Sequence, residues 1–122
     1  MGNRGAMVTT WGAGRPTVEP AKGMEVFGRA LGWYDELAKE GRITGYRVYG
    51  RTTSAGGMIV AEGDTTELSK ILTEERATTM LGLASAVVED VHSEVCIGGS
   101  PDDVTGYYTK MLEEFTAFGV NG

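Results

Sequence analysis

His92 and Glu94 are the side chains best suited to chemistry, because an imidazole beside a carboxylate can act as a general base. Alternate residues of a strand point to the same side and lie about 7 Å apart along the backbone. The two side chains can therefore reach each other or share a ligand. Three interpretations stay open: a solvated or interfacial pair, a catalytic acid–base pair, or a metal site that recruits Glu62. Nothing in the spacing requires a metal, and we predict none.

Cys96 and His92 are the only residues of their types, which raises the question of a Cys–His nucleophile pair. Four residues along a strand separate them by about 13 Å, whereas a nucleophile and its base need about 3 Å. The pair is therefore excluded within one strand, and we expect Cys96 to be a buried, inert thiol. Because Cys96 shares a strand face with His92 and Glu94, it remains a candidate ligand contact.

A second candidate group combines guanidinium and aromatic side chains. Arg47, Tyr49 and Arg51 share one strand face, and we expect Trp11 to lie on a neighbouring strand. Such groups bind planar carboxylates or phenolic rings through charge-assisted hydrogen bonds and stacking. Trp11, Arg47 and Tyr49, together with Glu62, are candidate ligand contacts. Protein interfaces are enriched in the same residue types, so a dimer interface is the competing interpretation.

Glycine and charge patterns restrict the ligand class. Gly12 and Gly14 begin a dinucleotide-binding fingerprint, but Thr17 stands where the third glycine is needed, so we predict a turn and no bound cofactor. The net charge is −6, with +3 in residues 1–57 and −9 in residues 58–122. An acidic chain lacks the cluster of basic side chains that nucleic-acid binding requires. The asymmetry is compatible with self-association.

Length and composition indicate one globular domain over residues 1–122. Hydrophobic residues make up 41% and charged residues 23%, which are ordinary values for a folded chain. The uncharged stretch between Ala77 and Glu89 is far too short to span a bilayer. Residues 1–6, which we expect to be flexible, lack the apolar core of a signal peptide. With one cysteine and no membrane segment, we expect a cytoplasmic protein.

The apolar periodicity predicts the elements that position these side chains. β-Branched and aromatic runs predict strands, and apolar steps of three and four residues predict helices. Asp64 with Glu67, and Ser100 with Pro101, are typical helix starts. The expected strands are 7–11, 43–51, 58–62 and 87–97; the expected helices are 21–40, 64–84 with a break near Thr73, and 101–118.

This order predicts an α+β, ferredoxin-like βαββαβ fold with a four-stranded antiparallel sheet and an added C-terminal helix. Both crossover helices then cover one face of the sheet. Strand parity places Val95 on the helix side, and His92, Glu94 and Cys96 on the other. The hairpin of the second and third strands is apolar on both sides, so we expect a second subunit to cover the free face.

The last helix and three methionines are expected to contribute to the core. The apolar face of the helix consists of Val104, Tyr108, Met111, Phe115 and Phe118. We expect it to dock on the domain through Tyr108, Met111 and Phe115. Met24, Met80 and Met111 have helical spacing and are assigned to the core as well.

The layout resembles the dimeric α/β-barrel group of ferredoxin-like proteins. The resemblance covers residues 7–100. Besides the order of elements, it rests on the aromatic first strand, Gly41-Arg42-Ile43, Glu62-Gly63-Asp64 and Val95-Cys-Ile-Gly-Gly99. It implies two sheets paired face to face, with a cavity between sheet and helices. Members include cofactor-independent monooxygenases, isomerases and haem-binding proteins, so the resemblance implies a fold and not a reaction.

We therefore expect a homodimer formed through the sheet that binds, or assists with, a small aromatic or carboxylate metabolite. The alternative is a cofactor-independent enzyme of the monooxygenase or isomerase type. In that enzyme His92 and Glu94 handle protons, and Arg47, Tyr49 and Trp11 hold an aromatic substrate. A purely structural self-association module is the third possibility.

Overall fold

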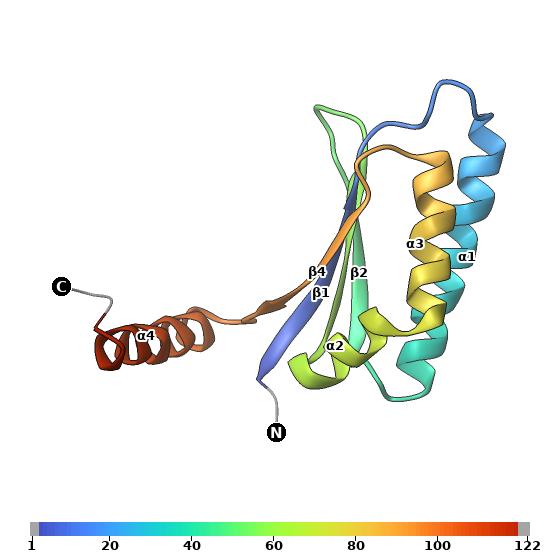
Figure 1. The fold of residues 1–122 in the computed structure, drawn as a ribbon. Coiled ribbons are helices and arrows are strands. Elements are labelled where there is room, and N and C mark those ends of the chain that lie inside the picture. Colours follow the sequence, from blue (N-terminus) through green and yellow to red (C-terminus); the bar gives the residue numbers. More distant parts are fainter. Residues whose placement is uncertain (1–2, 120–122) are drawn as a thin grey trace.

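Residues 3–119, which the computed structural model describes, form an antiparallel sheet flanked by helices (Figure 1). The elements are β1 (Arg4–Trp11), α1 (Pro20–Lys39), β2 (Gly45–Gly50), β3 (Gly57–Asp64), α2 (Thr65–Thr73), α3 (Glu75–Val87), β4 (His92–Ile97) and α4 (Pro101–Ala117). The four strands lie in the order β2-β3-β1-β4, and each is antiparallel to its neighbours. The predicted ferredoxin-like fold is confirmed.

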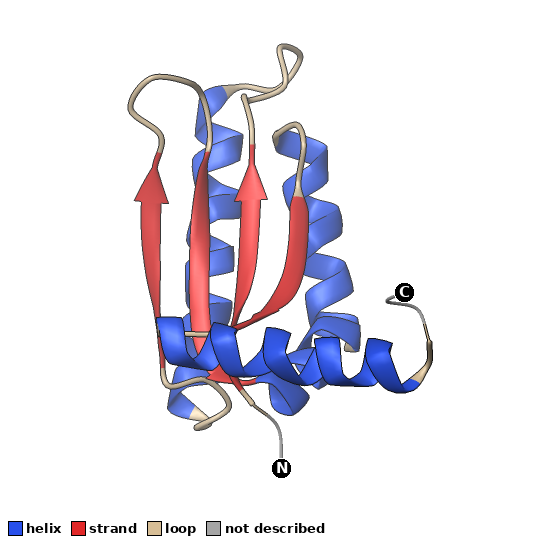
Figure 2. Cartoon of the chain, turned by 90° about the vertical axis from the view of Figure 1, so that its left-hand side faces the viewer, coloured by secondary structure: helices blue, strands red, loops and turns tan. Residues whose placement is uncertain are grey.

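Helices α1, α2 and α3 cover one face of the sheet (Figures 1 and 2). Met7 of β1 and Ile59 of β3 are buried beneath them, and Leu37 of α1 and Leu68 of α2 join the same core cluster. The opposite side, called the open face below, is covered by none of these three helices. The open face consists of Ala6, Val8, Thr10, Arg47, Tyr49, Met58, Val60, Glu62, His92, Glu94 and Cys96.

Local signals explain where the helices begin and end. Pro20 occupies the first turn of α1, where its missing N–H costs nothing, and Gly41 follows the helix with a left-handed φ of 74°. The Asp64 side chain accepts a hydrogen bond from the Glu67 N–H at 3.2 Å and so caps α2. Glu74 is extended and separates α2 from α3, which confirms the predicted break.

The strand boundaries differ most from the expected ones at two places. Residues 4–6, expected to be flexible, form the start of β1, where Arg4 pairs with Asp64 and Ala6 with Cys96. Met1 and Gly2 lie outside the described residues. The last strand begins only at His92, because the helix before it continues to Val87.

Helix α4 does not dock on its own domain. Its predicted start is confirmed, since the Ser100 hydroxyl accepts a hydrogen bond from the Asp103 N–H at 3.2 Å. No residue of α4 is buried, however, and Tyr108 and Phe115 are 52% and 42% exposed. Figure 1 shows the helix standing away from the sheet. The predictions that α4 docks through these side chains and joins the core are therefore wrong, and Met24, also assigned to the core, is exposed as well.

Gly28 and Gly32 are expected to weaken α1 without a compensating contact. A Cβ atom at either position would meet no atom within 4 Å, which contradicts the close packing that two interior glycines indicate. Replacing each by alanine should raise the free energy of unfolding by about 1 kcal/mol. Urea unfolding measures the change. Gly5→Ala is the opposite control, because its Cβ would collide with the Cys96 carbonyl oxygen and destabilise the fold.

Arg42 ties together the two ends of α2. Its Nε donates to Glu67 Oε2 at 2.6 Å, and its terminal nitrogens donate to the Glu74 carboxylate at 2.8 and 2.7 Å. These hydrogen bonds hold the pKa of Glu74 below its usual value. A planar guanidinium is needed for this arrangement, since lysine cannot bind two carboxylates in a fork.

Glu74→Gln is expected to destabilise the fold at pH 7 and to lose this effect in acid. Because the folded-state pKa is lowered, the carboxylate stabilises the fold above the pKa of an unfolded glutamate, about 4.3. That contribution disappears as the pH falls through the folded-state value. Urea unfolding of wild type and variant at pH 7 and pH 3 tests this, with Glu75→Gln as control. An equal deficit at both pH values would contradict the charged pair.

Candidate functional site

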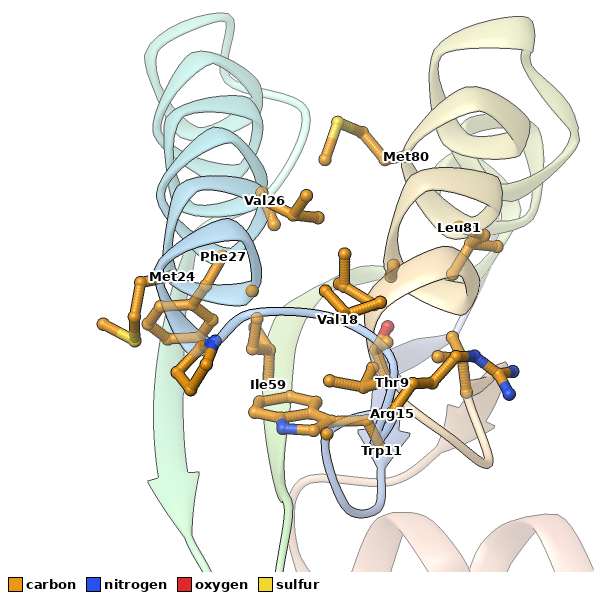
Figure 3. Close-up of a pocket in the computed structure, with 18 of the residues that line it drawn as sticks. Thr9, Trp11, Arg15, Val18, Met24, Val26, Phe27, Ile59, Met80 and Leu81 are labelled. Carbon is orange, nitrogen blue, oxygen red and sulfur yellow. The ribbon is translucent and has the colours of Figure 1, made fainter.

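A cavity of about 630 Å³ lies between α1, α3 and the helix-covered face of the sheet (Figure 3). Thr9 and Trp11 of β1 and Ile59 of β3 line it from the sheet, and the loop between β1 and α1 contributes Gly14, Arg15, Pro16, Val18 and Glu19. The helices contribute Pro20, Gly23, Met24, Val26, Phe27, Ala30, Trp33, Tyr34, Met80, Leu81, Ala84 and Val87, and Val88 and Val91 follow them. Small-molecule sites usually measure about 300–1,000 Å³.

Four aromatic side chains line this cavity. Trp11 and Phe27 lie with ring centroids 6.0 Å apart and their planes tilted by 55°, and Trp33 and Tyr34 lie 5.0 Å apart. Trp11 is the Cα partner of Gly57, and a Cβ there would lie 3.0 Å from the indole. The glycine therefore leaves the space in which the Trp11 ring packs toward α1.

Backbone hydrogen bonds fix the loop at the end of the cavity. The Gly12 N–H donates to the Glu89 carbonyl at 2.8 Å, and the Glu89 N–H donates to the Ala13 carbonyl at 2.8 Å. The Arg15 N–H donates to the Val87 carbonyl at 3.0 Å. The Arg15 side chain binds the same region, since its Nε donates to the Ser85 carbonyl at 2.7 Å. The loop is thus joined to the end of α3 and the residues that follow it.

Three hydroxyl groups form a chain beside the cavity. Thr9 Oγ1 lies 3.0 Å from the Tyr34 hydroxyl and 2.9 Å from Ser93 Oγ, within hydrogen-bond distance of both. Burial raises the pKa of Tyr34 although the hydrogen bond with Thr9 opposes the shift. Tyr34 is therefore protonated at neutral pH, and the chain offers hydrogen bonds without carrying a charge.

Other polar groups on the lining are few. Arg15 and Glu19 are its charged residues, and both belong to the loop. Within the part of the chain that the structure describes, Trp33 Nε1 is a buried side-chain donor without a hydrogen-bond partner. The cavity therefore combines an apolar lining with hydroxyl groups at the sheet and charges at the loop.

The predicted pair of His92 and Glu94 lies on the open face, across the sheet from this cavity. His92 Nε2 is 3.5 Å from Glu94 Oε1, so the two side chains do meet. Both are largely exposed. Cys96 shares their face and is exposed, which corrects the expectation of a buried thiol. Partial burial and then the Glu94 charge raise its pKa, so the thiolate is disfavoured.

The other predicted site residues are divided by the sheet. Arg47, Tyr49 and Glu62 belong to the open face, and interaction first with Tyr49 and then with Glu62 raises the pKa of Arg47. Trp11 belongs to the opposite face, because it shares the parity of Thr9 and Met7. The expected group of Trp11 with Arg47 and Tyr49 is therefore not formed within one chain.

The resemblance implied a cavity between sheet and helices, but of the candidate ligand contacts only Trp11 lines it, because the lining residues do not form one motif. Val18 is an apolar residue of a connecting segment, where exposed polar residues are the rule. That signal was available, whereas Val88 and Val91 fell inside the strand expected over residues 87–97. Met80 has a helical spacing typical of core residues, and the sequence alone does not distinguish a cavity wall from a packed core.

Two further properties concern residues 3–119 as a whole. In this range, no three His, Cys, Asp or Glu side chains come together in a way that could hold a metal ion. None of the helices in the same range has the length and apolar character needed to cross a membrane.

Comparison with known proteins shows a likeness of fold. No protein-family model matches the chain, and neither does any curated protein sequence. A dimeric ferredoxin-like protein of unknown function from Bacteroides fragilis aligns with a TM-score of 0.57 and 10% identity over 75% of this chain and 94% of its own. A putative antibiotic biosynthesis monooxygenase from Deinococcus radiodurans aligns with a TM-score of 0.59 and 12% identity, over 79% of this chain and 93% of its own.

The cofactor-independent oxygenase SnoaB from Streptomyces nogalater aligns with a TM-score of 0.55 and 13% identity, over 80% of this chain and 95% of its own. At such low identities the likeness concerns the fold alone. The chain thus has the ferredoxin-like fold, and the solved structures that it resembles include two described as dimeric and a putative antibiotic biosynthesis monooxygenase.

Proposed function

We propose that the protein binds a neutral, ring-containing small molecule in the cavity between α1, α3 and the sheet. The observation that carries the proposal is the cavity itself, an apolar space of about 630 Å³ with four aromatic rings on its lining. This makes the aromatic part of the expected ligand class the better fit. A carboxylate fits less well, because Arg15 pairs with the Ser85 carbonyl and Glu19 repels anions.

The rings favour a flat ligand. Trp11 and Phe27 both line the cavity with their ring planes tilted by 55°, so a flat molecule that stacks on one ring meets the other at a steep angle. Aliphatic side chains complete the enclosure: Met80, Leu81 and Ala84 from α3, opposite Val26 and Ala30 of α1. Shape and apolar contact thus select the ligand.

The hydroxyl chain supplies a donor for one polar atom of that ligand. Thr9, Tyr34 and Ser93 own three hydroxyl protons but make two hydrogen bonds among themselves, so one proton is left over in every arrangement. Thr9 and Tyr34 both line the cavity. In the arrangements that leave the spare proton on Thr9 or Tyr34, a ligand with a carbonyl or ether oxygen would accept it.

Binding of 9-fluorenone, compared with fluorene, tests the proposal. The two probes share their rings and differ in one carbonyl group. The chain has two tryptophans, Trp11 and Trp33, and both line the cavity, so ligand binding should quench their fluorescence. We expect both probes to bind and 9-fluorenone to bind about 2- to 10-fold more tightly, the value of one net hydrogen bond. Unchanged fluorescence with both probes would refute the proposal.

The second candidate function is a cofactor-independent oxygenase or isomerase. Two of the solved structures with this fold are described as oxygenases, one of them putative. In this chain His92 and Glu94, 3.5 Å apart, are the candidate acid–base pair. They cannot reach a ligand in the cavity of the same subunit, because the sheet lies between. This candidate therefore requires a substrate on the open face.

Oxygen uptake separates the oxygenase from a protein that only binds its ligand. If the protein is an oxygenase, an electron-rich phenol such as 1-naphthol should be consumed with oxygen, and His92→Ala should abolish the uptake. Glu94→Gln should reduce it as well. If the protein only binds its ligand, the wild type binds ring compounds without turnover, and both variants bind them as the wild type does.

We propose further that two copies pair through their open faces. Val8, Val60 and Met58 of this face are only partly buried, and Tyr49 is 49% exposed. A monomer would leave these side chains in water. Light scattering at micromolar concentration should return twice the chain mass of 13.0 kDa, and a particle of one chain mass would refute the dimer. A reducing cytoplasm, the proposed location, agrees with a single free cysteine.

A further inference from the structure

Helix α4 carries an apolar stripe with no counterpart in its own domain. Val104, Tyr108, Met111, Phe115 and Phe118 follow at alternating steps of four and three residues, which places them along one side of the helix. None of these side chains is buried, and Phe118 is 87% exposed. Polar residues such as Thr109 and Glu113 lie on the other side. The helix thus presents an organised apolar surface to something outside its own domain.

The helix is also a poor candidate for existence in isolation. It has 17 residues, little more than the length of about 12–15 residues below which isolated helices are marginal in water even for alanine-rich sequences. Gly106 in its interior costs about 1 kcal/mol relative to alanine, and the β-branched Thr105 and Thr109 add smaller penalties. Ser100 and Pro101 favour its start, but its stability must come from packing of the apolar stripe.

The position of α4 indicates where that packing occurs. Its principal contact with the domain is β4 at the edge of the sheet. From there it stands off on the side opposite α1 and α3, and it crosses in front of one end of the open face (Figures 1 and 2). A molecule that sits on the open face therefore comes within reach of α4.

The similar solved structures support a second copy of this chain as that molecule. The open face has mixed charge, because Glu62 and Glu94 accompany Arg47 there and Arg4 pairs with Glu62 at 3.6 Å. Its apolar side chains Val8, Met58 and Val60 are only partly buried, and no side chain of the stripe is buried. Two of the solved structures with this fold are described as dimeric. One chain thus provides two unpartnered apolar surfaces, and a second copy can cover both.

We propose that α4 is an exchanged arm: in a dimer paired through the open faces, the stripe of each α4 packs on the partner subunit. A two-fold axis makes the two contacts identical, so one sequence feature stabilises the assembly twice. The inference rests on the proposed dimer and adds the helix that holds it. Under this proposal α4 stabilises the dimer and does not stabilise the domain of its own chain.

Photo-crosslinking locates the contact. A benzophenone amino acid replaces Tyr108 in a mixture of unlabelled and ¹⁵N-labelled chains. Irradiation should produce crosslinked peptide pairs in which one peptide is unlabelled and the other is ¹⁵N-labelled, and such pairs join two different subunits. Glu113, on the polar side of α4, is the matched control position and should give few such products. Crosslinks from position 108 that join peptides of one chain, or no crosslinks at all, would overturn the exchange.

A double variant measures the strength of the contact. Tyr108→Glu with Phe115→Glu removes four aromatic anchors from the symmetric dimer and should raise the dimer dissociation constant by about 10³-fold, since buried aromatic anchors commonly contribute 1 kcal/mol or more each. Thr109→Glu with Glu113→Gln alters the other side of α4 at the same net charge as wild type and should leave the constant unchanged. In the NMR spectrum of each full-length variant, the amide signals of residues 3–99 should be those of a folded domain.

The remaining outcomes separate the two proposals. A wild type that is monomeric by light scattering refutes the dimer and the exchanged arm together. A double variant that dimerises as tightly as wild type refutes the arm alone and leaves pairing through the open faces intact. A double variant whose domain unfolds refutes the arm too, because α4 would then be part of its own domain. None of the three results bears on the proposal that the wild type binds a ligand in the cavity.

Discussion

Ala84→Phe is expected to lower the affinity for 9-fluorenone by at least about tenfold, which corresponds to 1.4 kcal/mol. Ala84 belongs to α3 and lines the cavity opposite α1. A phenyl ring at this position occupies volume that the ligand needs, and the rigid walls cannot move apart without loss of core contacts. Quenching of the two tryptophans gives the dissociation constants.

Ala86→Phe is the matched control, because Ala86 lies two residues along the same helix, is exposed and is not part of the lining. It should bind 9-fluorenone as the wild type does. Filling apolar space also stabilises a fold, so Ala84→Phe should raise the free energy of unfolding by about 0.5–2 kcal/mol. Lost binding combined with gained stability cannot arise from unfolding. Unchanged binding in Ala84→Phe would place the ligand elsewhere.

The fold could be predicted because its signals are local. Asp64 and Ser100 are helix caps that act through the next three residues, and Gly41 ends α1 through its own backbone conformation. Parity along β4 correctly separated Val95 from His92, since alternation needs no knowledge of other strands. Such features depend on the neighbouring residues of the chain and can be read from them.

The site could not be predicted in the same way, because it depends on the register between strands. Met7, Thr9 and Trp11 form one face of β1 and Val8 and Thr10 the other, and both sets mix apolar and polar groups. Nothing in the strand alone shows which set meets the helices. The error that placed Trp11 with Arg47 follows from this ambiguity.

Helix α4 illustrates a second limit of the sequence. Periodicity correctly grouped Tyr108, Met111 and Phe115 on one side of the helix. It does not indicate what covers that side, and an apolar stripe reads the same whether it packs on its own domain or on a partner. In the structure the stripe does not pack on the domain of the same chain, since none of these side chains is buried.

Removing one hydroxyl at a time from the chain of Thr9, Tyr34 and Ser93 should have unequal effects on stability. Tyr34→Phe deletes an end of the chain and leaves Thr9 bonded to Ser93, so it should cost about 0.5–1.5 kcal/mol. Thr9→Val deletes the middle and leaves the buried Tyr34 hydroxyl without its partner, which should cost about 1–3 kcal/mol. Urea unfolding measures both. A larger cost for Tyr34→Phe would contradict the central position of Thr9.

The effect of these variants on the preference between the two probes should not follow their effect on stability. The preference depends on how many hydroxyl protons remain free to donate to the ligand. Tyr34→Phe leaves two hydroxyls with one bond, and Thr9→Val frees the Tyr34 hydroxyl itself, so each single variant still offers a donor. Both should therefore keep the preference for 9-fluorenone over fluorene, and Thr9→Val should enlarge it. The double variant leaves only Ser93, which does not line the cavity, and should bind the two probes equally. A preference that survives in the double variant would assign the ligand's polar contact to another donor, of which Trp33 Nε1, buried and without a partner, is the first to examine.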